Sequence, residues 1–287
     1  MQYLVTILTD HDQLESLEEF LNLSNYIFSV ELFPGITKND TSFNVYSEDL
    51  VAQKDVFNTI SSFIAKNEKQ SLVSLSRSTL EDKDWQESWK KHFIPIVAGR
   101  LVVGISEEDI ASIDKVKVII DPGMAFGNGS HPTTKGCLIL IDRYLEAGMK
   151  VLDFGSGSGV LAIACDKLGA DLIDAMDNDA VAVEACKRNV KHNDSKVKVY
   201  TSEEFEIRKD YNFVIANITV DVIIQFFKYF TEGQQSLKYV LLSGISDYRK
   251  SQMDIFLNTE GIIPADVYED DGWYTYLLTC NKTGGIK

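Results

Sequence analysis

The segment from Val151 to Asp177 constrains the fold of this chain more than any other stretch. Its sequence, VLDFGSGSGVLAIACDKLGADLIDAMD, predicts a strand, a glycine turn, a helix and a second strand. Gly155, Gly157 and Gly159 permit positive φ in the turn and let a ligand lie against backbone N–H groups at the start of the helix. Asp177 follows Gly155 by 22 residues. An acid at that distance binds ribose hydroxyls in doubly wound sheets.

Two classes of cofactor fit this segment. A nicotinamide or flavin dinucleotide requires GxGxxG or GxGxxA, which fails from Gly155 because the sixth residue is Val160, and which GSGVLA satisfies from Gly157. In that second frame Asp153 lies close to the pyrophosphate, and like charges repel. S-adenosylmethionine has no phosphate, and a carboxylate attracts its ammonium and sulfonium groups. The residues therefore favour S-adenosylmethionine over a dinucleotide, and a turn that binds no cofactor remains a further alternative.

Charge and composition limit the partners of the chain. It has 287 residues, long enough for a large and a small domain, and a net charge of −15 at pH 7. This charge disfavours nucleic acid as a direct partner, although acidity can equally serve solubility alone. The four cysteines include no C-x-x-C pair, the sequence has no apolar run of 18 residues, and we expect no export signal. We expect a cytoplasmic monomer without a membrane span or a metal site.

The first 76 residues predict a separate small domain. Strand and helix patterns alternate in the order βαββαβ, which is that of the ferredoxin-like α+β plait. Since no catalytic cluster occurs in this domain, we expect either a substrate-recognition domain or a structural extension. The predicted elements are Tyr3–Leu8, Asp12–Leu21, Tyr26–Phe33, Phe43–Ser47, Asp49–Ala65 and Leu72–Leu75.

The rest of the chain predicts a linker and a larger α/β domain. Residues 77–113 are expected to connect the two domains, with Trp85 and Trp89 on one helical face and a hairpin turned at Gly99. Residues 114–287 alternate strands and helices and end in two strands separated by a turn. A final hairpin added to a parallel sheet predicts the seven-stranded, Rossmann-like fold of class I methyltransferases.

Two further segments supply candidate site residues. The loop Asp121–Gly136, DPGMAFGNGSHPTTKG, is rich in glycine and proline, and Thr133 or Thr134 is suited to cap the helix that follows. Asn217, in FVIANIT, comes directly after an apolar strand, where its carboxamide oxygen is suited to accept an N–H from an attacking amine. Simpler interpretations are that Thr134 is an ordinary cap, that His131 is a loop histidine bonded to backbone, and that Asn217 is a turn-former.

Together these motifs resemble the PrmA family, bacterial methyltransferases of the eleventh large-subunit ribosomal protein. AFGNGSHPTT is similar to the family's AFGTGTHPTT, DFGSGSGVLAIACDKLGA to its DFGCGSGILAIAALKLGA, and VIANIT to its VVANIL. The first match is the most specific, because glycine motifs of the second type occur across many methyltransferases. Asn128 and Ser130 replace threonines of the family pattern, and Thr219 replaces an apolar residue.

The resemblance implies both the reaction and the site. The family transfers methyl groups from S-adenosylmethionine to lysine side chains and an N-terminal α-amine of a basic ribosomal protein, which its small N-terminal domain presents. The family's cofactor-contacting positions correspond to Thr134, Gly155, Asp177 and Asn217, and its donor-closing loop contains Phe126. With Asp153 and Gly157 of the glycine turn, these seven residues form the predicted cofactor site. Asn217 is also the predicted catalytic residue, which orients the amine.

Four other functions are alternatives. A dinucleotide-dependent oxidoreductase would use the second frame of the glycine motif, and Asp153 disfavours it. A methyltransferase of RNA or DNA is disfavoured by the negative charge and by NIT in place of an NPPY-type motif. A methyltransferase of another protein or of a small molecule has the same motifs. A non-catalytic module with a vestigial site is disfavoured because Asp153, Asp177 and Asn217 are all present.

Overall fold

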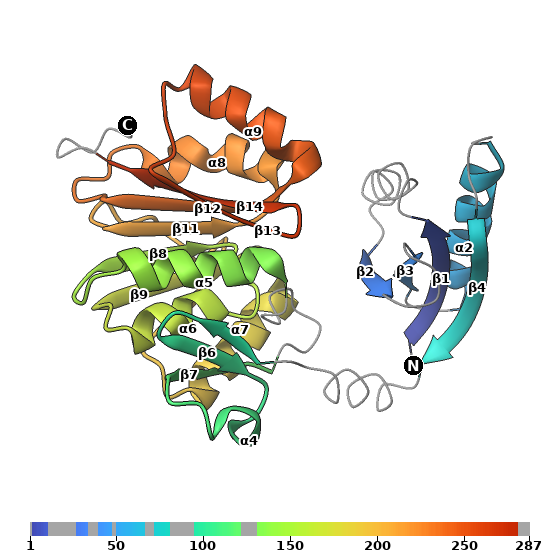
Figure 1. Cartoon of the computed structure of the whole chain (residues 1–287), viewed down its shortest axis with the longest axis horizontal. Coiled ribbons are helices and arrows are strands. Elements are labelled where there is room, and N and C mark those ends of the chain that lie inside the picture. The colour runs from blue at the N-terminus through green and yellow to red at the C-terminus, as the bar shows by residue number, and fades with distance from the viewer. Residues whose placement is uncertain are drawn as a thin grey trace. The chain divides into compact units, whose positions relative to one another are not determined.

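The computed structural model describes residues 2–10, 27–33, 40–47, 50–66, 72–80, 95–121 and 131–280. The chain divides into two compact units, Met1–His92 and Phe93–Lys287 (Figure 1). Some predicted features lie outside the described residues: the helix at 12–21, Trp85, Trp89 and the cofactor-site residue Phe126.

The first unit is an antiparallel sheet with one described helix, α2 (Leu50–Lys66). Its sheet order is β2-β3-β1-β4. Alternate residues of β1, Val5 and Ile7, are buried against Val56 and Ile60, which lie one turn apart on α2. The described elements agree with the predicted plait. The strands are β1 (Gln2–Asp10), β2 (Ile27–Phe33), β3 (Asp40–Ser47) and β4 (Leu72–Leu80).

The second unit is built on a seven-stranded sheet in the order β10-β9-β8-β11-β12-β14-β13. The first five strands in this order are parallel, and β14 is antiparallel to both of its neighbours. This confirms the predicted parallel sheet with a final hairpin. The strands are β8 (Lys150–Phe154), β9 (Leu172–Asp177), β10 (Lys198–Thr201), β11 (Phe213–Asn217), β12 (Tyr239–Ser246), β13 (Asp266–Asp270) and β14 (Trp273–Thr279).

Helices cover both faces of this sheet (Figure 1). Val151 of β8 packs in the core with α5 and α6, while the next residue, Leu152, packs in the core with α8 and α9. Burial on both faces explains why the strands are apolar runs. No helix in the described part of the chain is long and apolar enough to span a membrane. The helices are α5 (Pro132–Tyr144), α6 (Val160–Lys167), α7 (Ala180–His192), α8 (Val220–Thr231) and α9 (Asp247–Thr259).

A small three-stranded sheet packs beside α5 and α6. It consists of β5 (Ile96–Ala98), β6 (Leu101–Gly104) and β7 (Val116–Ile119), with the short helix α4 (Glu107–Ile110) between β6 and β7. Gly99 turns the β5–β6 hairpin with φ +57°, as predicted. This hairpin, expected in the connecting segment, belongs to the second unit because its apolar residues share the core of α5 and α6. The domain boundaries at residues 76 and 113 stay a prediction.

Two buried asparagines, one within α7 and one at its C-terminal cap, attach β7 and the glycine turn to the rest of the unit. Asn193, the cap, accepts the Ile119 N–H at 2.9 Å and donates to the Ile119 carbonyl oxygen at 2.6 Å. Asn189 accepts the Asp121 N–H at 3.0 Å and donates to the carbonyl oxygens of Asp121 at 3.2 Å and Ser158 at 2.9 Å. Each carboxamide therefore makes, to the N–H and the carbonyl oxygen of one residue, the hydrogen bonds that a neighbouring strand would make.

Replacing Asn193 with alanine is expected to lower the free energy of unfolding by about 2–3 kcal/mol, because it leaves the N–H and carbonyl of Ile119 buried without partners. Urea denaturation measures the change. Asn258→Ala, at an exposed position of α9, is the matched control and is expected to change the free energy of unfolding by less than about 0.5 kcal/mol. Equal midpoints for the two variants would contradict the bridging role of Asn193.

Candidate functional site

The candidate site lies at the carboxyl ends of the parallel strands. The chain order reverses between β8 and β11, and ligands of open α/β sheets bind where the order reverses. β11 ends at Asn217, which pairs with Ser243 of β12. The Ser243 Oγ lies 3.4 Å from the carbonyl oxygen of Thr133, so the start of α5 also reaches this edge. The structure thus brings the glycine turn, Asp177, Asn217 and the first turn of α5 to one edge of the sheet.

The glycine turn has the conformation predicted for it. Gly155, Gly157 and Gly159 have φ values of +78°, +54° and +82°. A β carbon on Gly155 would lie 2.4 Å from Cγ2 of Ile218, and one on Gly159 would lie 2.5 Å from Sγ of Cys186. Positive φ and close packing therefore both require glycine at these two positions.

The backbone N–H groups of the turn differ from the expectation that they face a ligand. Those of Gly155 and Ser156 both donate to the Met176 carbonyl oxygen, at 2.9 and 3.0 Å. That of Gly157 donates to Asp177 Oδ2 at 2.8 Å. A pyrophosphate needs such N–H groups as donors. Because these N–H groups already donate within the protein, and that of Gly157 donates to the carboxylate of Asp177, the turn is not suited to bind a dinucleotide.

Asp177 is held in a single orientation at the end of β9. Its side chain is buried, and its Oδ1 accepts the Asp179 N–H at 3.0 Å while Oδ2 accepts the Gly157 N–H. A carboxylate oxygen has two lone pairs, so each oxygen retains one for a ligand hydroxyl. This geometry suits the predicted contact with the two hydroxyls of a ribose.

Asp177→Ala is expected to raise the dissociation constant of S-adenosylmethionine about 10- to 100-fold, because hydrogen bonds to a charged group contribute about 1.5–3 kcal/mol. Titration calorimetry measures this constant directly. Asp171→Ala removes an exposed carboxylate at the opposite end of β9 and should leave the affinity unchanged. An equal affinity in both variants would exclude Asp177 from the donor site.

Asp153 is a buried carboxylate with an incomplete set of hydrogen bonds. Its exposed fraction is 1%, and its Oδ2 accepts the Ala162 N–H at 3.1 Å. Its Oδ1 has no partner among the residues that the structure describes. Burial, with a smaller contribution from the nearby charge of Asp177, raises the pKa of Asp153 to about 7 against the opposing effect of the Ala162 N–H. A cationic ligand would stabilise the charged form of this carboxyl group.

The cap of α5 is His131, so the predicted cap at Thr133 or Thr134 is wrong. Nδ1 of His131 accepts the Thr133 N–H at 3.3 Å, and Pro132 occupies the first helical position. Proline is preorganised for that position and needs no acceptor for an N–H, which places the cap one residue before it. The helix ends at Tyr144, whereas the sequence predicts a helix that runs to Glu146. Thr134 is buried, and its Oγ1 has no partner within the described ranges.

His131 also contacts an aromatic residue that the sequence did not reveal. Its ring lies edge-on to Trp273, with 4.6 Å between the ring centroids. Burial lowers the pKa of His131 to about 4, although the charge of Asp271 opposes this, so the imidazole is neutral at pH 7. Its Nδ1 also lies 2.7 Å from the Thr133 hydroxyl oxygen. The interpretation of His131 as a loop histidine bonded to backbone is confirmed.

Asn217 does not behave as a simple turn-former. A turn-forming asparagine bonds its own backbone two residues on. Here the Asn217 Oδ1 is buried and accepts no hydrogen bond from any residue that the structure describes. The Ile218 N–H instead donates to the Ser243 carbonyl oxygen at 3.2 Å. The carboxamide oxygen therefore remains available for a ligand.

Buried polar atoms without partners gather at this edge. Five such side-chain atoms occur within the described residues, and four belong to the carboxyl edge of the sheet. A buried unsatisfied polar atom costs about 1–3 kcal/mol, so a ligand with complementary groups would be stabilised here. Ser156 was not predicted, although its place between two motif glycines was a signal. The four atoms are Thr134 Oγ1, Asp153 Oδ1, Ser156 Oγ and Asn217 Oδ1.

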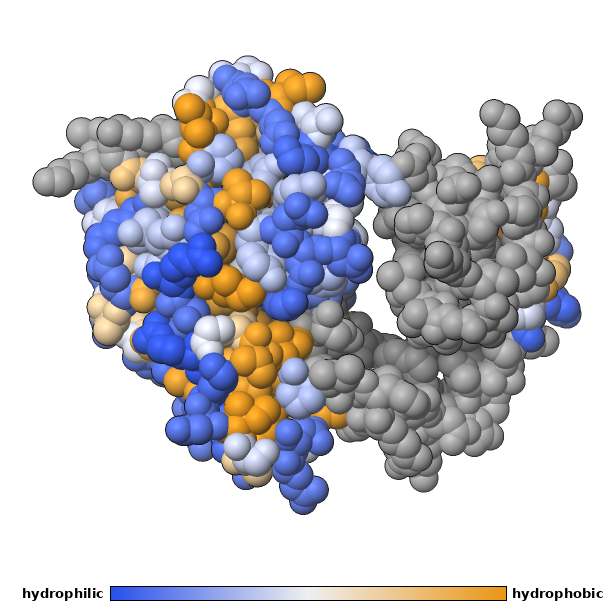
Figure 2. Space-filling view, in the orientation of Figure 1, coloured by the Kyte–Doolittle hydropathy of each residue, from blue (hydrophilic) through white to orange (hydrophobic). Residues whose placement is uncertain are grey.

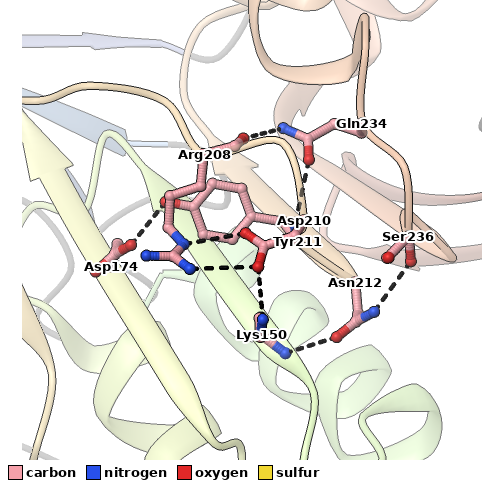
Figure 3. Close-up of polar contacts among 8 residues, drawn as sticks. All are labelled: Lys150, Asp174, Arg208, Asp210, Tyr211, Asn212, Gln234 and Ser236. Carbon is pink, nitrogen blue, oxygen red and sulfur yellow. Dashed lines mark hydrogen bonds and ion pairs between the residues drawn. The ribbon is translucent and has the colours of Figure 1, made fainter.

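The amino ends of the same strands are joined by a polar network (Figure 3). Asn212 accepts the Lys150 N–H at 2.8 Å and donates to the Ser236 carbonyl oxygen at 3.0 Å, which links the starts of β8, β11 and β12. Asp210 binds both Lys150 and Arg208. The polar groups of this network bond one another, so we interpret its role as joining the strands and not as binding a ligand.

Comparison with known proteins identifies the family. The family model described as "Ribosomal protein L11 methyltransferase (PrmA)" matches residues 11–280. The chain belongs to the PrmA family. It is 35% identical over 208 residues to the ribosomal protein L11 methyltransferase of Dictyoglomus turgidum, covering 71% of this chain and 69% of the relative. It is 36% identical over 201 residues to that of Dictyoglomus thermophilum, covering 68% and 66%.

A solved structure shares the fold of this PrmA chain. It is the ribosomal protein L11 methylase of Lactobacillus delbrueckii subsp. bulgaricus, with a TM-score of 0.57 and 23% identity over 64% of this chain and 97% of that one. The family and the fold together identify an S-adenosylmethionine-dependent methyltransferase. The dinucleotide-dependent oxidoreductase, left open by the sequence, is thereby excluded.

Proposed function

We propose that this chain transfers methyl groups from S-adenosylmethionine to amines of ribosomal protein L11, both lysine side chains and the N-terminal α-amine. The relatives named above support this acceptor. The observation that carries the placement of the site is the group of four buried polar atoms without described partners at the carboxyl edge of the sheet. A methyltransferase of another protein or of a small molecule remains the second candidate.

The residues at this edge fit the donor. Asp177 is placed to accept hydrogen bonds from ribose hydroxyls, and Asp153 to stabilise a nearby cation. Thr134 supplies a buried hydroxyl from α5. Gly155 and Gly157 form the turn beside this edge with positive φ values. S-adenosylmethionine itself supplies an electrophilic methyl group on a sulfonium.

The enzyme must receive the acceptor amine in its neutral form. A free lysine has a pKa of about 10.4, and a neighbouring positive charge lowers that pKa by repulsion. A bound sulfonium provides such a charge, so no dedicated general base is required. The contribution of the protein is alignment, which supplies roughly 7–11 kcal/mol in well-oriented reactions. Asn217 orients the amine through its unsatisfied Oδ1.

The surface charge supports a basic protein acceptor. The net charge of −15 attracts a basic protein and repels nucleic acid. Hydrophilic residues cover most of the coloured surface in Figure 2, and hydrophobic residues lie in smaller groups between them. We infer that the N-terminal plait, residues 1–76, recognises the acceptor. We place the reaction in the cytoplasm, where ribosomal proteins are made, and we expect a monomeric enzyme, which light scattering checks.

Mass spectrometry of purified ribosomal protein L11 incubated with enzyme and donor tests the proposal. We expect mass increments of whole methyl groups on lysines and on the N-terminal amine. The Asp177→Ala variant and a second basic ribosomal protein serve as controls for the donor site and for the acceptor. An unmodified L11, with donor binding intact by calorimetry, would assign the enzyme to a different acceptor.

A further inference from the structure

Ile218, the residue after Asn217, packs closely against two glycines, Gly244 and Gly155. Gly244 of β12 has φ +84°, and a β carbon on it would lie 2.2 Å from the carbonyl oxygen of Ile218. The Ile218 N–H donates to the neighbouring Ser243 carbonyl oxygen at 3.2 Å. On the other side, Cγ2 of Ile218 occupies the space that a β carbon on Gly155 would need. Ile218 thus contacts β12 through its backbone and the glycine turn through its side chain.

The close approach of Gly244 results from an irregularity in β12. Leu242 pairs with Tyr276 of β14, and Ile245 pairs with Tyr274, so three residue steps on β12 face two on β14. This is a β-bulge at Ser243 and Gly244. Bulges redirect the chain and are common next to active sites. Gly244 has a positive φ of +84°, which glycine adopts without the steric cost that a β carbon brings.

Buried polar contacts hold the bulge in place. Ser243 and Thr275 are both buried, and their hydroxyl oxygens lie 2.7 Å apart. The Ser243 Oγ also approaches the Thr133 carbonyl oxygen at the start of α5. The bulge is therefore fixed against β14 and against the helix that carries Thr134. Its conformation can determine the position of Ile218 and of the carboxamide beside it.

We propose that Ile218 and Gly244 are positioning residues for methyl transfer. The Ser243–Gly244 bulge sets the position of the Asn217–Ile218 peptide, and the Ile218 side chain fixes the distance from that peptide to the glycine turn. The acceptor-orienting carboxamide and the donor-binding turn are thereby held in one geometry. This inference rests on the proposed function, and neither residue contacts the reacting atoms in it.

Gly244→Ala tests the bulge, and Gly148→Ala is its matched control. Gly148 has the same φ of +84°, but a β carbon there meets nothing within 4 Å. Both variants therefore acquire the same backbone strain, and only Gly244→Ala displaces the Ile218 carbonyl. We expect Gly244→Ala to lower kcat about 10- to 100-fold, since displacements near 1 Å cost about that much, with the donor Kd within about threefold. Gly148→Ala should retain the wild-type kcat.

A second pair of variants tests the side chain of Ile218 without adding atoms to the bulge. Ile218→Val retains Cγ2, which lies against Gly155, and is expected to retain kcat. Ile218→Leu moves the branch away from the β carbon and is expected to lower kcat about tenfold, with a smaller effect on donor affinity. Rescue by valine but not by leucine would distinguish positioning from a simple loss of packing volume.

A spectroscopic measurement follows Asn217 independently of turnover. Its side-chain NH₂ signals in the donor-free protein are assigned by their absence in Asn217→Ala. They should shift in Gly244→Ala and remain unchanged in Gly148→Ala. Unmoved signals, or a kcat equal to that of the Gly148 variant, would overturn the inference. If the wild-type enzyme fails to methylate L11, the proposed function fails, and the NMR comparison still decides the role of the bulge.

Discussion

Asn217→Ala is expected to lower the rate of methyl transfer about 100-fold and to leave the donor Kd within about threefold. The reason is that its Oδ1 is buried with no partner among the described residues, at the end of β11 where we propose that the acceptor amine binds. Losing this acceptor atom removes alignment of the amine but few donor contacts. Steady-state kinetics gives kcat, and titration calorimetry gives the donor affinity.

Asn212→Ala is the control from the opposite end of the same strand. Its carboxamide joins the starts of β8, β11 and β12, as Figure 3 shows. Its loss should lower the urea midpoint and leave kcat unchanged. Asn217→Ala should lower kcat and leave the urea midpoint unchanged. If Asn217→Ala reduces turnover and donor affinity by equal factors, Asn217 is a donor ligand only and does not orient the amine.

Asp153→Asn is expected to stabilise the donor-free protein at pH 8 and to weaken donor binding about 10- to 100-fold. The folded pKa of Asp153 is raised from 3.8 to about 7. Its contribution to stability is therefore fully present below about pH 4 and is lost as the pH rises through 7. At pH 8 the buried charge costs roughly 4 kcal/mol. Asparagine avoids that charge but buries an amide donor, so we expect a net gain of about 2 kcal/mol.

The pH dependence makes this prediction specific. At pH 5 the carboxyl group is protonated in the folded state and ionised in the unfolded state, so its cost falls to roughly 2 kcal/mol. The buried amide of the asparagine variant costs about as much, so the advantage of that variant should disappear in urea denaturation at this pH. Asp171→Asn, at an exposed position, should show no difference at either pH. A gain of equal size at pH 5 and pH 8 would show that burial of charge at Asp153 is not its cause. The donor site would then carry no stability cost from this carboxylate.

The sequence by itself determined the strands, turns and helices whose patterns lie within a short continuous segment. Apolar runs, the spacing of Gly155 and Gly157 and the acid at 177 predicted the parallel sheet, the left-handed turn and the carboxyl-edge site, because strand, turn and helix periodicities act over a few residues. Their specific motifs also carried the resemblance to the PrmA family. Phe126 lies outside the described residues and stays a prediction.

Tertiary structure decided the features that depend on residues distant in sequence. The Ile218 carbonyl fits only against Gly244, and Asn193 meets Ile119 only when α7 packs beside β7. The pKa of Asp153 depends on burial, which no local pattern specifies. The cap at His131, by contrast, is local, because proline at the first helical position places the cap one residue before it. Local geometry follows from neighbouring residues, whereas close approaches, burial and hydrogen-bond satisfaction are properties of the packed sheet and its helices.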